Sequence, residues 1–139
     1  MLRCVAALAV VVTLISPSSV SFGQFDEDGD LIPGLLGTYV AGDHSVEQID
    51  VTLSHSWGET APDERLPEGP FSVTWQSQLL QREEVEYRFH AYLQGAVEVQ
   101  VDGETVLIGS RDKPGWISGD PIELSFGLLE FEVTFEKTQ

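Results

Sequence analysis

The chain of 139 residues is long enough for one domain with its own hydrophobic core and too short for two. Seven lysines and arginines stand against 23 aspartates and glutamates, giving a formal net charge of −16. Such a surface argues against nucleic acid as a partner, because phosphate binding needs basic side chains. Hydrophobic residues make up 42% of the sequence, too many for a disordered acidic chain.

The first 23 residues have the pattern of an export signal. Arg3 supplies a positive charge, residues 4–15 form an apolar run, and Ser21 and Gly23 offer the small residues of a cleavage site. This run is shorter than the roughly 20 residues that a helix needs to cross a bilayer. We therefore predict a secreted or periplasmic domain that does not insert into a membrane after cleavage. The alternative is a retained N-terminal anchor.

The single cysteine, Cys4, lies inside this predicted signal. The exported part would contain no internal disulfide, no thiol nucleophile and no cysteine for haem attachment. Cys4 also lies at the start of the apolar run and not after it, which argues against a lipid attachment site. Packing alone must hold such a domain together.

Residues 24–33 are acidic and rich in turn-forming residues, and we predict a tether there. Asp26, Asp28 and Asp30 have the one-three-five spacing of a calcium-binding loop. However, Leu31 occupies the sixth position, where such a loop requires glycine. A solvated tether without a metal ion is the favoured interpretation.

From residue 34 to 139, apolar residues recur mostly at every second position, as in strands with one buried face. The pattern predicts strands over residues 49–57, 71–79 and 85–93, with their odd-numbered side chains in the core. No helical period extends beyond about two turns. We predict an all-β fold, an antiparallel β-sandwich or barrel of about seven or more strands.

Two hairpins are predicted from local sequence. Asp102 and Gly103 separate two apolar runs, and this pair favours a type I′ turn because both of its central residues need positive φ. A second hairpin is expected around Gly127, where the apolar residues of 122–126 would pair with those of 129–135.

The order of several short motifs resembles a known family. These motifs are GLLGTY at residues 34–39, FSVTW at 71–75, YRF at 87–89 and VDG at 101–103. Together they resemble the protective-antigen fourteen-kilodalton (PA-type) domain, a β-barrel module of exported bacterial toxins, adhesins and glycosidases. The resemblance implies a non-catalytic accessory module that positions or attaches a larger assembly outside the cytoplasm.

The sequence departs from this family in two places. Calcium-dependent, glycan-binding members carry paired aspartates just before a glycine, where this chain has Leu93, Gln94 and Gly95. Neither Leu93 nor Gln94 offers an anionic oxygen, so we predict no calcium-dependent sugar binding. The family also continues past the strand that ends near Phe135. A shortened relative, or an N-terminal piece of a longer protein, would leave a sheet edge open to a partner strand.

No motif marks a catalytic residue, a metal site or a cofactor site. None of the 23 carboxylates is distinguished as the acid and base pair of a glycosidase. The three histidines, His44, His55 and His90, lack the His-x-x-x-His spacing of a zinc pair. Neither a nucleophile elbow nor a phosphate-binding glycine loop is present in the sequence. We predict that the chain is not an enzyme and holds no cofactor.

Three residues are predicted to contact a ligand. Trp57 and Trp75 share the parity of their core-facing neighbours, so we expect both to pack in the core. Trp116 lies in a predicted loop, where its ring would be exposed. With Gln94 and Arg111 it would form a calcium-independent carbohydrate site. This binding function is the alternative to the accessory function, and the expected partner is an extracellular glycan or a protein.

Overall fold

The computed structural model describes residues 7–14, 20–25, 28, 31–51, 53–56, 61–81 and 85–137. Eleven strands and no helix occur in these ranges, which confirms the all-β prediction. No helix among them is therefore long and apolar enough to cross a membrane. The strands are β1 (Ala7–Leu14), β2 (Val20–Phe25), β3 (Leu31–Pro33), β4 (Leu35–Ala41), β5 (His44–Asp50), β6 (Ser54–Ser56), β7 (Phe71–Gln81), β8 (Val85–Val101), β9 (Glu104–Ser118), β10 (Ile122–Leu124) and β11 (Gly127–Lys137).

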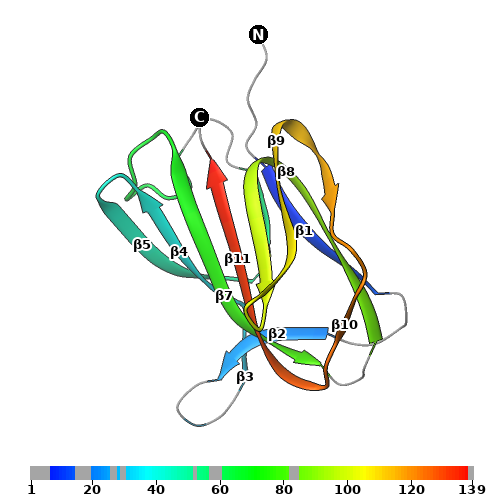
Figure 1. The fold of residues 1–139 in the computed structure, drawn as a ribbon. Helices are drawn as coiled ribbons and strands as arrows, with labels where there is room; N and C mark the ends of the chain where they lie inside the picture. The colour runs from blue at the N-terminus through cyan, green and yellow to red at the C-terminus, as the bar shows by residue number, and fades with distance from the viewer. Residues whose placement is uncertain are drawn as a thin grey trace.

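The strands form one continuous antiparallel sheet that folds over into two facing layers (Figure 1). One layer contains β5, β4, β7, β11 and the second half of β8. The other contains the first half of β8, followed by β1 and β6. The long hairpin of β8 and β9 belongs to both layers, because β9 pairs with both halves of β8. The predicted antiparallel sandwich or barrel is confirmed.

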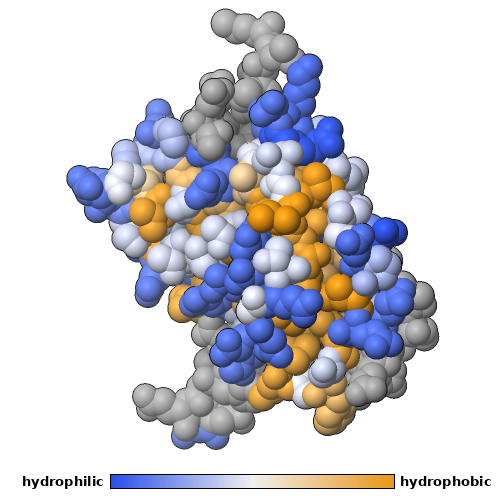
Figure 2. Space-filling view, in the orientation of Figure 1, coloured by the Kyte–Doolittle hydropathy of each residue, from blue (hydrophilic) through white to orange (hydrophobic). Residues whose placement is uncertain are grey.

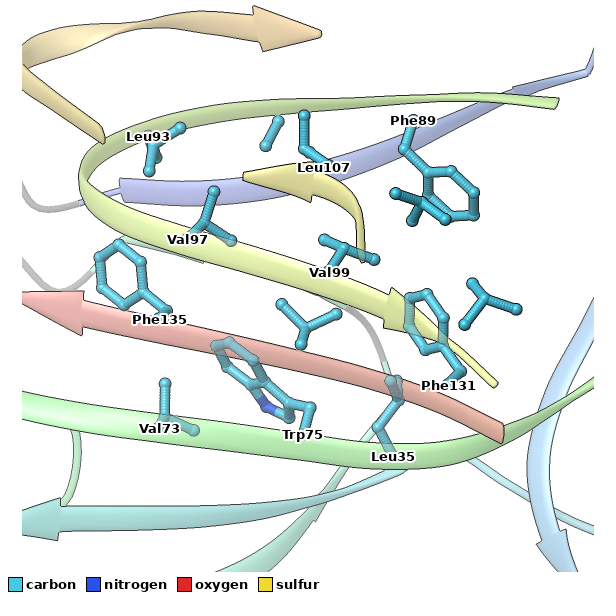
Figure 3. Packing of buried hydrophobic residues seen from close by; sticks show 14 of the residues in the cluster. Leu35, Val73, Trp75, Phe89, Leu93, Val97, Val99, Leu107, Phe131 and Phe135 are labelled. Atoms are coloured by element: carbon cyan, nitrogen blue, oxygen red, sulfur yellow. The ribbon is translucent and has the colours of Figure 1, made fainter. Parts of the chain in front are cut away.

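β8 turns from one layer into the other at Gly95. The φ angle of Gly95 is 130°, a backbone conformation that residues with a Cβ atom rarely adopt. The pairing register with β9 shifts between Leu93 and Gly95, which marks a β-bulge. Figure 3 shows the strand curving back between the labelled Leu93 and Val97. One strand thereby supplies core residues to both layers.

Alternate side chains of β7, β8 and β11 fill the interior (Figure 3). Trp75, Phe89 and Phe135 are each 0% exposed. Phe89 stacks on Phe131 of the opposite layer, with ring centroids 6.2 Å apart. Burial of each such aromatic side chain contributes roughly 1.5–3 kcal/mol. The predicted core parity of residues 71–79 and 85–93 is confirmed by the buried side chains of Phe71, Val73, Trp75, Ser77, Leu79, Tyr87, Phe89, Ala91 and Leu93.

The predicted turn at Asp102 and Gly103 is confirmed. Both residues have positive φ, 50° and 79°, and Val101 pairs with Glu104 across the turn. The carboxylate of Asp102 also accepts a hydrogen bond of 2.7 Å from the backbone N–H of Glu130. The tip of the hairpin is therefore attached to β11.

The predicted single strand over residues 49–57 is wrong. β5 ends at Asp50, and β6 is a separate short strand. Ile49 and Val51, expected in the core, are 50% and 77% exposed. The side chain of Asp50 is partly buried instead, because two hydrogen-bond donors of the core face it. Trp57 lies outside the described residues.

The predicted hairpin around Gly127 is also wrong. β10 pairs with β8, not with β11. β7 and β8 pair with the two edges of β11, so along much of its length β11 has no free edge to which β10 could pair. Phe126, expected in the first strand of this hairpin, lies between β10 and β11 and is 71% exposed. The positive φ of Gly127, 119°, helps the chain to change direction between the two strands.

β1 and most of β2 lie in the predicted export signal, and β3 lies in the predicted tether. β2 pairs with β3 and β7, while β1 pairs with β6 and β8. The predicted signal over residues 1–23 and the predicted tether over residues 24–33 stay predictions, because the fold does not report where the chain is cleaved. Of the aspartates with calcium-loop spacing, Asp28 is exposed, whereas Asp26 and Asp30 lie outside the described residues.

Candidate functional site

The pairing of β8 with β9 brings the three predicted contact residues together beside the bulge. Gly95 pairs with Arg111, and Tyr92 pairs with Trp116. Trp116 belongs to β9 and not to a loop as the sequence suggested, but it is 54% exposed. Gln94 lies between the two pairs on β8. The three residues are far apart in the sequence and adjacent on the surface.

Hydrogen bonds to the backbone fix the segment that carries Trp116. The guanidinium of Arg111 donates a hydrogen bond of 3.3 Å to the backbone carbonyl oxygen of Trp116. The side-chain amide of Gln94 donates one of 3.1 Å to the backbone carbonyl oxygen of Asp112. Gly115 provides the space for this arrangement. A Cβ atom there would lie 2.4 Å from Nε of Arg111. The backbone around Trp116 is thus held in place while its indole stays accessible.

Tyr92 adds a second aromatic ring to this surface. Its ring contacts Trp116 edge to face, with centroids 5.4 Å apart and an angle of 65° between the planes. We call Tyr92, Gln94, Arg111 and Trp116 the β8–β9 aromatic face. Sequence reasoning did not include Tyr92. Its position two residues before Gln94, on the same polar parity, was the signal that could have identified it.

The same outward side of β8 continues with His90 and Arg88. Nδ1 of His90 lies 2.7 Å from Oγ of Ser118, and Nε of Arg88 donates to the carbonyl oxygen of Gly119 at 2.9 Å. Alternate residues of one strand therefore present a row of aromatic and hydrogen-bonding groups. A row of this kind can contact an extended ligand that lies along the strand.

A second polar cluster lies inside the layer of β4, β5 and β7, and sequence reasoning missed it. Oδ2 of Asp50 accepts hydrogen bonds from the Tyr39 hydroxyl and, at 2.8 Å, from the Trp75 indole N–H. Oδ1 accepts a bond of 2.9 Å from the amide of Gln48. Three donors thus engage this carboxylate. It connects the end of β5 to β4 and β7.

The Asp50 cluster is tightly packed where it contacts Gly37. A Cβ atom on Gly37 would lie 2.9 Å from Oδ2 of Asp50 and 3.0 Å from Nε1 of Trp75. His55 stacks on the ring of Trp75, with centroids 5.5 Å apart and planes 10° from parallel. The tight packing and the engaged oxygens indicate a structural role for Asp50.

We expect the Tyr39 hydroxyl to make stability depend on alkaline pH. Burial, together with its bond to Asp50, raises the pKa of Tyr39 above its ordinary range. The unfolded chain would release this proton near pH 10, whereas the folded chain retains it. The stabilisation is therefore complete below pH 10 and is lost as pH rises further. Chemical denaturation across this range should show a steeper loss of stability in the native chain than in Tyr39→Phe.

A depression of about 550 Å³ lies on the outward side of β7, β8 and β11. Gln76, Gln100 and Glu132 are among the residues that line it, and the amide of Gln76 donates to the Glu132 carboxylate at 3.1 Å. No group of three or more His, Cys, Asp or Glu side chains suited to a metal ion occurs in the described part of the chain. The depression lacks the exposed aromatic rings of the β8–β9 face.

No protein-family model matches the sequence, and no curated protein matches it. Among solved structures, the chain resembles part of a GH31 alpha-xylosidase from Xanthomonas citri, with 15% identity and a TM-score of 0.65. The match covers 99% of this chain and 16% of that enzyme. At this identity the likeness shows the fold alone. The chain is a β-domain similar to one segment of a glycosidase.

Proposed function

We propose that the chain is a non-catalytic accessory module of the PA type, which positions or attaches a larger assembly outside the cytoplasm. The observation that carries this proposal is the fold match to a segment that makes up 16% of a much larger enzyme. The export signal predicted in residues 1–23 supports a secreted or periplasmic location. The motif order from residue 34 onward supports the PA type.

The surface suits an interaction module. Figure 2 shows hydrophilic side chains over much of this face and an apolar band running down its middle. Ile108 of β9 is 67% exposed, and Leu128 of β11 is 51% exposed. Contiguous apolar surface on a folded domain marks contact sites for other molecules. The oxygens of Asp50, by contrast, already accept hydrogen bonds from Tyr39, Trp75 and Gln48.

Assays with chromogenic glycosides and esters test the non-catalytic proposal. We expect the purified protein to release product at the rate of a buffer control. Glycoside hydrolysis needs one carboxyl group of raised pKa and a second, ionised carboxylate at a set distance from it. No such pair is evident among the described residues. Turnover that survives further purification and disappears in a carboxylate variant would contradict the proposal.

The β8–β9 aromatic face favours a second function, calcium-independent carbohydrate binding. Sugar rings pack their apolar faces on aromatic rings, and their hydroxyl groups bond to nearby polar side chains. Trp116 and Tyr92 supply the rings, and the exposed guanidinium of Arg111 has N–H groups in addition to those that donate to the backbone of Lys113 and Trp116. Leu93 and Gln94 precede Gly95 where calcium-dependent relatives have aspartates, so binding would need no metal.

Replacing Trp116 by alanine should weaken binding to a polysaccharide at least about tenfold, because exposed aromatic anchors carry much of such binding energy. A glycan array followed by titration calorimetry would measure the change. Phe126→Ala, which removes another exposed aromatic side chain outside the β8–β9 aromatic face, should bind like the native chain. Addition of a chelator should leave binding unchanged. Loss of binding with chelator, or equal binding by both variants, would contradict this function.

A further inference from the structure

β1 has strand partners on both sides within the second layer. It pairs antiparallel with β8, from Leu8 opposite Leu93 to Leu14 opposite Tyr87. Its other edge pairs with β6, and β6 has no second partner among the described strands. Figure 1 shows β1, in dark blue, alongside the first half of β8. We call the position between β8 and β6 the β1 slot.

The β8 residues along this slot belong to the hydrophobic core. Four of them, at alternate positions, are 0% exposed, namely Tyr87, Phe89, Ala91 and Leu93. The β1 residues in register with them are all apolar, namely Leu14, Val12, Val10 and Leu8. The slot is therefore suited to an extended segment with an apolar residue at every second position.

The occupant of the slot lies in the segment predicted to be removed on export. Cleavage after residue 23 would remove β1 and leave Tyr87–Leu93 as an edge of the sheet, with backbone groups that no longer have a strand partner. It would also remove the only described partner strand of β6. A long apolar edge is a template for another strand. The exported domain would therefore present an edge position suited to another strand.

We propose that β1 occupies the slot only temporarily, and that after its removal an apolar β-strand from a partner polypeptide of the exported assembly takes its place. The partner strand runs antiparallel to β8 and presents apolar residues opposite Tyr87, Phe89, Ala91 and Leu93. Backbone hydrogen bonds provide affinity, and the alternating residues provide specificity. This inference rests on the export proposed above and specifies how the accessory module would attach.

Strand exchange in the full-length chain tests the proposal. A protease site is inserted within residues 15–19, between β1 and β2, and the chain is cut after folding. A labelled, lysine-flanked peptide of residues 5–16 is then added in excess. We expect the peptide to replace β1 and to migrate with the rest of the chain.

Two control peptides separate strand addition from nonspecific hydrophobic binding. The first control peptide carries Val10→Asp and Val12→Asp, at the positions in register with the buried Ala91 and Phe89. Its binding should be at least about a hundredfold weaker, because carboxylates are costly to bury. The second control peptide carries Val11→Asp and Thr13→Asp, at the positions in register with the outward-facing His90 and Arg88. It should bind nearly as well as the native peptide. Equal binding of both control peptides would overturn the proposal.

Hydrogen exchange of the β8 amides provides a second measurement that needs no new variant. Protection of Tyr87–Leu93 should decrease when β1 is removed and return when the native peptide is added. Unchanged protection after removal would show that β1 does not fill the slot, and would overturn the proposal. The intact mass of the exported product tests export separately. A product that retains residues 1–23 would overturn the proposal even if the peptide binds, because the slot would then never become vacant.

Discussion

Replacing Gly95 by alanine should lower the free energy of unfolding by about 3 kcal/mol or more. The φ of 130° at this position is strained for any residue with a Cβ atom, at a cost of about 1–3 kcal/mol. The added Cβ would also lie 2.5 Å from the carbonyl oxygen of Glu136 and 2.9 Å from Cε2 of Phe135. Relief of that overlap costs a further 1–3 kcal/mol or so. Denaturant titration followed by tryptophan fluorescence would measure the loss.

Gly103→Ala is the matched control for this variant. Gly103 also has a positive φ, 79°, but a Cβ there would meet no atom within 4 Å. Its replacement should therefore cost only about 1–2 kcal/mol, from backbone strain alone. If the two variants lost equal stability, the close approach of β8 to β11 at the bulge would not be a determinant of the fold. Gly95→Ala should also reduce ligand binding, because the bulge places Arg111 opposite Gly95.

Replacing Asp50 by alanine should lower the free energy of unfolding by about 3 kcal/mol. The variant leaves the Tyr39 hydroxyl and the Trp75 indole N–H without their acceptor inside the domain. A buried donor without an acceptor costs about 1–3 kcal/mol. Asp50 is itself partly buried, so solvent can offset some of the loss. Thermal and chemical denaturation would both report the change.

Glu123→Ala serves as the control, because Glu123 is an exposed strand carboxylate and its removal should change stability by no more than about 0.5 kcal/mol. A double-mutant cycle with Tyr39→Phe tests the hydrogen bond itself. Tyr39→Phe should cost less stability in the Asp50→Ala background than in the native chain, since its acceptor is already absent. Additive effects of the two substitutions would contradict the coupling.

The sequence by itself determined the elements whose signals are local. Two-residue alternation identified β7 and the first half of β8, because a strand with one buried face must place every second side chain in the core. The turn at Asp102 and Gly103 followed from the positive φ that its two residues tolerate. The burial of Trp75 followed from its parity within β7.

Only the tertiary structure decided which strands meet and which polar groups lie inside. Alternation predicts the two faces of a strand but not its partners, so β10 was assigned to β11 although it pairs with β8. Asp50 is partly buried, with Ile49 exposed, because Tyr39 and Trp75 from other strands offer it hydrogen bonds. Trp116 contacts Tyr92 because the register of the β8–β9 hairpin and its bulge places them opposite each other. Such contacts join residues distant in the sequence, and their energies appear only once the chain has folded.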